Sequence, residues 1–246
     1  MQFFDTHIHL SDFENTTPHN LMQRLKNVGI EKCICVSSQP KDWEKTAEFA
    51  HTFPSHVIPA FGIHPWYADQ FNTKSLQKLE KYLNQFPTAF IGECGFDRLK
   101  NPDFEMQRLV FENQLQLAIR RQRPMILHMV KADMWFNAYL GKLPHKSVFH
   151  SFSGPAEFLK KILKFDSYIS VNAKFFRKKD ALNILKQIPE NKLLIETDAP
   201  FQSMPEDLPD TVHKIADIKA LNLPEAAQKL YDNALNLISD DINLTY

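Results

Sequence analysis

Histidines and a carboxylate occur near the start of the chain at a spacing that suits a metal site. His7 and His9 are separated by one residue, and Asp5 comes two residues before His7. In an extended segment, residues two apart point to the same side, so both imidazoles and Asp5 are expected to face one way. Neutral imidazole is the commonest protein ligand of transition metals. The motif therefore predicts half of a metal site, with a surface or hydrogen-bonded core pair as the alternative.

Polar side chains of the same kinds follow other short apolar runs of the chain. They are His64, Glu93, Asp97, His128, His150, Glu196 and Asp198. Aspartate and glutamate are rarely buried without a partner, because isolating a carboxylate in apolar surroundings is unfavourable. A cluster of histidines and carboxylates around cations would resolve this, whereas the alternative is a buried polar network without metal. The pattern favours a metal-dependent active site.

Eight short apolar runs have the length and composition of strands. They are Met1–Phe4, Lys32–Ser37, Val57–Ile63, Ala89–Gly92, Pro124–His128, Ser147–Phe152, Ser167–Val171 and Leu193–Glu196. Helical patterns lie between and after them, over Lys41–His51, Thr73–Phe86, Phe104–Gln122, Pro155–Leu163, Asp180–Ile188, Thr211–Ala220 and Pro224–Ile238. Strands that are apolar on both faces and alternate with helices predict a parallel sheet covered by helices.

Eight such units in 246 residues fit an α/β fold, a (β/α)8 TIM barrel built as a single domain over residues 1–246. Such barrels typically have about 250 residues. The alternative, a doubly wound open sheet, favours a glycine-rich first turn, which Asp5-Thr6-His7-Ile8-His9 is not. In a barrel the carboxyl ends of all strands meet at one mouth, where active sites are built. We therefore expect the polar residues to converge at that mouth.

The composition limits the class of protein. Lysine plus arginine and aspartate plus glutamate number 29 each, so the net charge is zero and bulk electrostatics would not hold a nucleic acid. The three cysteines are too few for a disulfide framework, and we expect the pair Cys33 and Cys35 to be buried as small apolar residues. The sequence has neither a secretory signal pattern nor a membrane-spanning run, so the cytoplasm is the expected compartment.

Six motifs, taken in chain order, resemble those of a known family. They are Asp5-Thr6-His7-Ile8-His9, Gly62-Ile63-His64-Pro65, Gly92-Glu93-Cys94-Gly95-Phe96-Asp97, His128, Phe149-His150-Ser151-Phe152-Ser153-Gly154 and Glu196-Thr197-Asp198-Ala199-Pro200. Together they resemble the TatD family of metal-dependent hydrolases. The resemblance implies an amidohydrolase-type TIM barrel with two divalent metal ions. It implies that His7, His9 and Asp198 hold one ion, that His128 and His150 hold the other, and that Glu93 bridges them. Characterised members are deoxyribonucleases that remove nucleotides from DNA ends.

Two divalent cations about 3.5–4 Å apart lower the pKa of a bound water and stabilise both oxygens of an in-line displacement. We expect Asp198 to act also as the general base, and Glu93 to be the second catalytic carboxylate. Asp5, Asp97 and Glu196 are expected to orient the metal ligands, with a structural cap as the alternative for Asp97. A histidine-rich site suits Zn²⁺, Mn²⁺ or Fe²⁺, whereas Mg²⁺ prefers oxygen, and the sequence does not choose among them.

The sequence determines the substrate less well than the metal centre, because two phosphate-binding elements that are common in the family are absent. Val130 stands where an arginine is common, and residues 201–207 lack the usual arginine and Asn-Glu-Pro stretch. Lys174 and Arg177, in a basic stretch after the seventh strand, and also His64, are expected to contact substrate, although such a stretch is often a solvated face. The expected substrates are DNA ends or a smaller phosphodiester, with no membrane and no obligate protein partner. A metal-dependent amidohydrolase or lactonase acting on a small molecule is the alternative, and an inactive scaffold is disfavoured.

Overall fold

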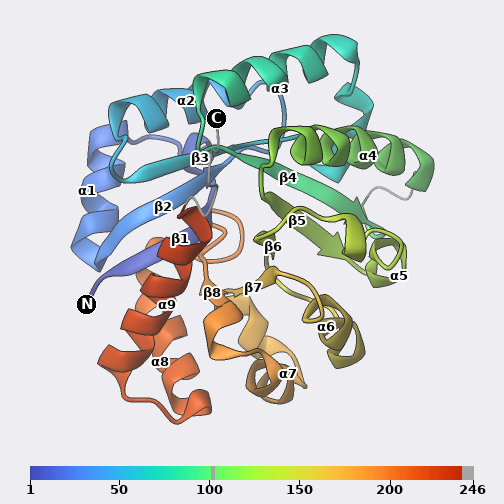
Figure 1. Cartoon of the computed structure of the whole chain (residues 1–246). Helices are drawn as coiled ribbons and strands as arrows, with labels where there is room; N and C mark the ends of the chain where they lie inside the picture. Colours follow the sequence, from blue (N-terminus) through green and yellow to red (C-terminus); the bar gives the residue numbers. More distant parts are fainter. Residues whose placement is uncertain (101–102, 240–246) are drawn as a thin grey trace.

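The computed structural model describes residues 1–100 and 103–239 and contains a barrel-shaped sheet surrounded by helices (Figure 1). Eight parallel strands follow one another around the sheet in chain order. They are β1 (Phe3–Ile8), β2 (Ile30–Val36), β3 (Val57–Phe61), β4 (Phe90–Asp97), β5 (Met125–Val130), β6 (Ser147–Phe149), β7 (Ser167–Val171) and β8 (Leu193–Ile195). The predicted TIM barrel is confirmed.

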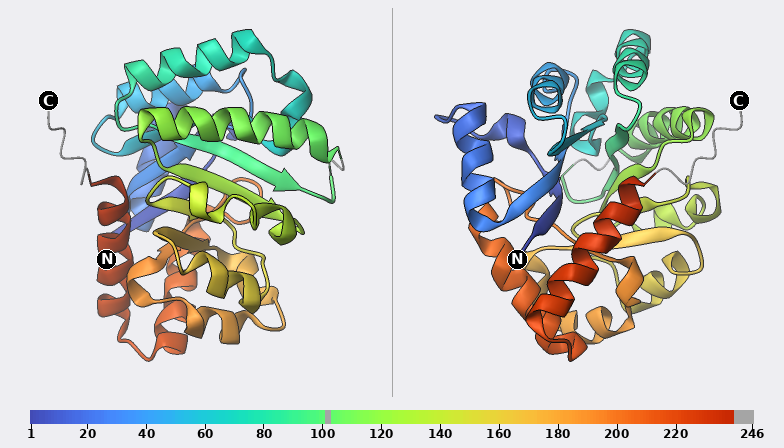
Figure 2. Two further views of the ribbon diagram at one scale, coloured as in Figure 1. Left: turned by 45° about the vertical axis from the view of Figure 1, so that its right-hand side comes forward. Right: turned by 60° about the vertical axis from the view of Figure 1, so that its left-hand side comes forward.

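The helices lie on the outside of the sheet (Figures 1 and 2). They are α1 (Pro18–Val28), α2 (Trp43–Thr52), α3 (Thr73–Gln85), α4 (Phe104–Arg121), α5 (Asp133–Phe136), α6 (Ala156–Ile162), α7 (Ala181–Gln187), α8 (Leu208–Lys219) and α9 (Leu223–Ile238). Short 3-10 turns interrupt the loops, among them η2 (Pro65–Gln70) and η4 (Ala173–Arg177). Among the described residues, none of the helices has both the length and the apolar character needed to cross a membrane.

Helix α1 was not among the predicted helices, although its sequence carries ordinary helix signals. Thr17 precedes the helix and its side chain accepts a hydrogen bond from the Asn20 backbone, and Pro18 occupies the first helical position. Gly29 ends the helix with φ 92°, a left-handed conformation that favours glycine. Both ends of this helix could therefore have been predicted from the sequence.

Strand β1 extends further than predicted. The predicted strand ended at Phe4, but the observed strand continues to Ile8, so Asp5 and His7 lie within it rather than after it. Strand β4 likewise runs on to Asp97 and includes Glu93. Buried polar residues therefore form part of the strands themselves, which the apolar pattern did not reveal.

Two apolar clusters hold the barrel together. The smaller one fills the sheet's interior with alternate strand residues, including Phe4, Ile126 and Leu194, and α9 adds Ala234 and Leu237 to it. Both views of Figure 2 place α9 next to the start of the chain. Because α9 covers the end of the barrel where the strands begin, the opposite end is left for a functional site.

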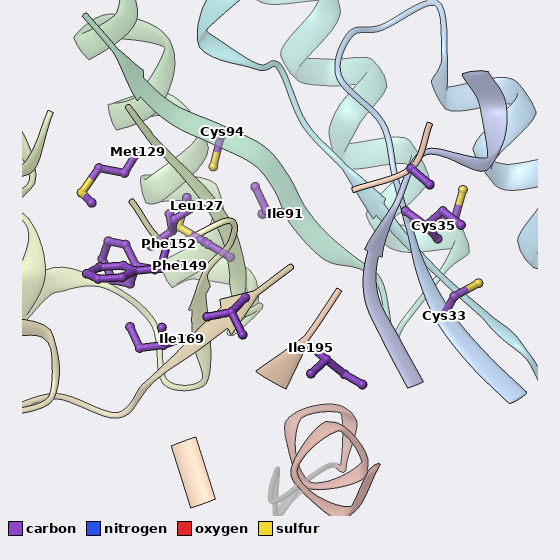
Figure 3. Close-up of a cluster of buried hydrophobic side chains, with 14 of the residues drawn as sticks. Cys33, Cys35, Ile91, Cys94, Leu127, Met129, Phe149, Phe152, Ile169 and Ile195 are labelled. Carbon is purple, nitrogen blue, oxygen red and sulfur yellow. The ribbon is translucent and has the colours of Figure 1, made fainter. Parts of the chain in front are cut away.

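The larger cluster lies between the strands and the outer helices, and part of it is drawn in Figure 3. It contains Cys33, Cys35 and Cys94, which are all free thiols and fully buried. The prediction that Cys33 and Cys35 are buried small apolar residues is confirmed. Burial raises the pKa of Cys35 to about 12, so its thiol stays protonated at neutral pH.

Candidate metal centre

The first wall of the centre is formed where β1 meets the segment that follows β8. The backbone N–H of Asp198 donates to the carbonyl of His7 at 2.8 Å, and the N–H of His9 donates to the carbonyl of Ala199 at 2.9 Å. These bonds place Asp198 Oδ1 3.2 Å from His9 Nε2 and 3.8 Å from His7 Nε2. The two imidazole Nε2 atoms face each other at 3.0 Å. The sequence-distant carboxylate thus joins the two neighbouring histidines.

The second wall comes from the ends of β5 and β6. His128 Nδ1 and His150 Nε2 lie 3.3 Å apart, and both are buried. Asp97, the last residue of β4, accepts a hydrogen bond from His128 Nε2 at 3.2 Å. That bond leaves the Nδ1 lone pair of His128 directed into the cluster.

Glu93 lies between the two walls. Its Oε1 is 2.6 Å from both His128 Nδ1 and His150 Nε2. Its Oε2 is 3.4 Å from His7 Nε2 and 3.6 Å from His9 Nε2. One oxygen of this carboxylate thus faces His7 and His9, and the other faces His128 and His150.

Close packing of β4 against β5 brings Glu93 near His128. At Gly95, φ is +143°, and an added Cβ would lie 2.1 Å from the carbonyl oxygen of His128. Only glycine allows the two strands to approach this closely. Glu93 and His128 consequently reach each other across the strand pair.

His64 also lies inside the cluster, where it contacts two of the other residues. Its Nε2 is 3.1 Å from His128 Nδ1 and 3.4 Å from Glu93 Oε1. The Trp66 backbone N–H donates to His64 Nδ1 at 3.0 Å, so the neutral ring carries its proton on Nε2. A protonated Nε2 donates hydrogen bonds and does not bind metal. The geometry thus places the His64 Nε2–H donor against His128 Nδ1 and, at a longer distance, against Glu93 Oε1.

Glu196 and Asp5 hold the segments that carry the candidate ligands, and they do so through different contacts. Glu196 Oε1 accepts from the Ser151 backbone N–H at 2.6 Å and lies 3.6 Å from His150 Nδ1. Among the described residues, Asp5 forms no hydrogen bond or ion pair with an imidazole ring. Its oxygens accept from the Thr197 N–H at 3.0 Å, from the Thr197 hydroxyl at 2.6 Å and from the His7 backbone N–H at 3.1 Å. Asp5 therefore ties β1 to the segment that follows β8, and it contacts the candidate ligand His7 through the backbone.

The neighbours of each buried group decide its charge. Burial would raise the pKa of Glu93, but the adjoining imidazoles, above all His150, hold it well below its ordinary value. Burial likewise opposes ionisation of Asp198, yet the hydrogen bond from His9 lowers its pKa. Burial lowers the pKa of His64 to about 4. At neutral pH the two carboxylates are therefore ionised and His64 is neutral.

The donor atoms of the cluster suit a divalent cation. The ligand atoms of His7, His9 and Asp198 all lie within 4.8 Å of one another. Within the described part of the chain, the buried Nδ1 atoms of His7, His9 and His150 have no hydrogen-bond partner, and neither has Glu196 Oε2. The ring nitrogens that face Glu93 are the Nε2 atoms of these three histidines. Imidazole and carboxylate together are the ligand set of Zn²⁺, Mn²⁺ and Fe²⁺, so the residues fit the predicted centre.

Comparison with known proteins identifies the family. The sequence pattern of the family described as "TatD related DNase" matches residues 4–239. The chain belongs to this family. Deoxyribonuclease Tat-D of Schizosaccharomyces pombe is 28% identical, over 94% of this chain and 88% of its own length. The 3'-5' ssDNA/RNA exonuclease TatD of Edwardsiella piscicida is 29% identical, over 76% of this chain and 75% of its own length.

The fold comparison agrees with the family. The crystal structure of YjjV, a TatD homologue from Escherichia coli, matches with a TM-score of 0.87 at 26% identity, covering 96% of this chain and 97% of that one. The chain is thus a TatD-family hydrolase with the family's barrel.

A cavity of about 380 Å³ opens beside the second wall of this TatD-family centre. It is lined by His128 and His150, and by Lys174 and Arg177 from η4. The structure thus places the two cations expected to contact substrate next to the candidate ligands. Gln202, which sequence reasoning did not single out, lines the cavity too, and its side-chain amide donates to Asp198 Oδ2. No spacing rule indicates this contact, because it depends on how the loop after β8 folds back.

Proposed function

We propose that this protein is a divalent-metal-dependent phosphodiesterase that removes nucleotides from DNA ends, using two metal ions. The observation that carries the proposal is the position of Glu93, whose two oxygens each face a different pair of histidines. A carboxylate between two sets of ligands is the arrangement expected for a pair of bridged cations. The names of the relatives from Schizosaccharomyces pombe and Edwardsiella piscicida, a deoxyribonuclease and an exonuclease, favour the same reaction.

Each ion has a proposed set of ligands in the chain. His7, His9 and Asp198 would hold one, His128 and His150 would hold the other, and Glu93 would contact both. When bound, divalent cations lower the pKa of water and stabilise negative charge on phosphate oxygens.

Asp198 is the proposed general base. Its Oδ2 accepts a hydrogen bond from Gln202, while its Oδ1 faces His9 inside the cluster. Its lowered pKa keeps it ionised at neutral pH, so it is able to accept a proton from the attacking water. The Nε2–H of His64 would donate to Glu93 or to a substrate oxygen. These two side chains would therefore hold the proton and orient the reacting groups.

The test is hydrolysis by protein loaded separately with Zn²⁺, Mn²⁺, Fe²⁺ or Mg²⁺. The substrates are end-labelled single-stranded DNA, bis(4-nitrophenyl) phosphate, and a panel of lactones and amides. We expect phosphodiester cleavage that needs metal, disappears with a chelator and is lost in Glu93→Ala and Asp198→Asn. Glu157→Ala, at an exposed position of α6, is the matched control and should retain activity.

Two outcomes would count against the proposal. Full activity of Glu93→Ala would rule out a bridging role for this carboxylate. Hydrolysis of lactones or amides without any cleavage of phosphodiesters would instead support the alternative of a metal-dependent amidohydrolase or lactonase.

A further inference from the structure

The cavity beside the metal centre has an unusual distribution of charge. Four of its lining residues are cationic, namely Lys131, Lys174, Arg177 and Lys178. None of the described residues that line it is aspartate or glutamate. No described carboxylate forms a salt bridge with any of the four cations, although the charge of Asp180 raises the pKa of Lys178. The described lining of the cavity therefore carries four cationic side chains and no carboxylate.

Lys178 is held in this cavity by specific contacts. Its ammonium lies 5.5 Å from the ring centre of Phe152 and 5.3 Å from that of Phe175. It donates one hydrogen bond, of 3.0 Å, to the Phe152 backbone carbonyl. An ammonium has three donor hydrogens, so this contact leaves two for a ligand. Burial lowers the pKa of Lys178 to about 8, a cost that a structural lysine at the surface would avoid.

Lys131 adds a cation from the loop that follows β5. It directly follows β5 with φ 54°, a left-handed conformation that is uncommon outside glycine. Its side chain lines the same cavity as Lys178, and its charge is close enough to lower the pKa of Lys178.

The size of the cavity limits what it holds. About 380 Å³ is near the lower end of the range for small-ligand sites, about 300–1,000 Å³. Such a space holds one nucleotide-sized group rather than a longer stretch of nucleic acid. A phosphomonoester carries about −1.5 to −2 charges at neutral pH, so it gains more from several cations than a singly charged diester does.

We propose that this cavity is a subsite for a phosphomonoester, which receives a terminal phosphate of the substrate while the metal centre receives the scissile diester. This inference rests on the proposed phosphodiesterase function and adds a preference to it. The preferred substrates carry a second, terminal phosphate group next to the bond that is cleaved. Lys178 and Lys131 are the residues that would confer the preference.

Calorimetric binding to the metal-loaded protein tests the subsite without hydrolysis. The probes are adenosine 3',5'-bisphosphate and the two adenosine monophosphates, phosphorylated at the 3' or at the 5' position. We expect the bisphosphate to bind at least about tenfold more tightly than either monophosphate. Lys178→Met keeps the length of the side chain between the two rings, and Lys131→Met changes an exposed side chain. Each should remove most of the difference.

Lys179→Met is the matched control. Lys179 is exposed, is adjacent to Lys178 in sequence, and is not among the residues lining the cavity. This variant should keep the wild-type preference. Equal affinity of the wild type for the bisphosphate and the monophosphates would overturn the proposal, as would an undiminished preference in both Lys178→Met and Lys131→Met.

Hydrolysis of bis(4-nitrophenyl) phosphate, which has no second phosphate, separates this inference from the proposed function. If this diester is cleaved but the bisphosphate has no advantage, the subsite is wrong and the reaction stands. If the bisphosphate binds preferentially through Lys178 but no phosphodiester is cleaved, the reaction is wrong and the anion subsite stands. Thymidine tetranucleotides with a 5'-phosphate, a 3'-phosphate or free hydroxyl ends then show whether the preference extends to DNA ends.

Discussion

Replacing Asp97 by asparagine tests how the centre fixes the orientation of His128. Asp97 Oδ2 accepts from the Trp66 indole N–H at 2.6 Å and from His128 Nε2 at 3.2 Å. Its Oδ1 accepts from the backbone N–H groups of Leu99 at 2.7 Å and Lys100 at 3.0 Å. All four partners are donors, so this site requires two accepting oxygens. Asparagine supplies only one.

The consequence for metal binding follows from this count. If the amide group faces His128, the imidazole must give up its Nε2 proton and carry it on Nδ1, the nitrogen directed at Glu93. A protonated Nδ1 cannot bind a cation. Loss of such a supporting carboxylate typically weakens metal affinity about 10- to 100-fold. This factor corresponds to about 1.4–2.8 kcal/mol.

The opposite amide orientation has a different result. The amide group would then face the backbone donors of Leu99 and Lys100, leaving them without an acceptor. Leu99 and Lys100 are exposed, so water would replace the lost acceptor, and the free energy of unfolding would fall by only about 0.5–1.5 kcal/mol per hydrogen bond. Either orientation makes Asp97→Asn measurably worse than wild type.

Competition with a metal-binding dye gives the affinity of each site, and denaturant unfolding of the metal-free protein gives the stability. We expect Asp97→Asn to weaken the proposed site of His128 and His150 and to spare the proposed site of His7 and His9. Asp103→Asn is the matched control, because Asp103 caps α4 through the Met106 N–H and asparagine is an equally good cap. Wild-type metal affinity and wild-type stability in Asp97→Asn would together refute the reasoning.

Two further predictions concern Gln202 and Lys178. Gln202→Leu removes the amide that holds Asp198 Oδ2, so kcat should fall on the order of tenfold with little change in KM. Gln187→Leu, at a partly exposed position of α7, is the control, and an unchanged kcat in Gln202→Leu would contradict a positioning role. The pKa of Lys178 is lowered to about 8 in the folded protein, so its charge destabilises the fold below that pH. Lys178→Met should be more stable than wild type at pH 7 in denaturant titrations, and its advantage should shrink as pH rises from about 8 to about 10.5; a constant difference would contradict this.

The pattern of apolar residues along the chain was sufficient to predict the barrel architecture. Strand β7 has the predicted bounds, Ser167–Val171, because its residues are buried on both faces and the flanking segments are polar. The pattern was less informative where strands contain buried polar residues. His7 and Glu93 lie inside β1 and β4. The predicted ends of these strands were too early, because a polar residue after an apolar run indicates a loop.

The types of the metal-binding candidates could likewise be predicted from sequence. Parallel strands in a barrel bring their carboxyl ends to one mouth, so a histidine or carboxylate at each end must converge there. The family motifs indicated which of these residues to expect as ligands. Neither argument needs the distances between them.

The sequence by itself determined the fold, the family and the residues that converge, because periodicity and local motifs act over short stretches of chain. Only the tertiary structure decided how those residues pair. It placed Glu93 between two pairs of histidines, gave the His64 proton to Nε2, and directed Asp5 to Thr197. It also separated Lys178, which lines the cavity, from Lys179, which does not. These contacts join segments that are far apart in the chain, and they depend on closure of the barrel and on the path of its loops.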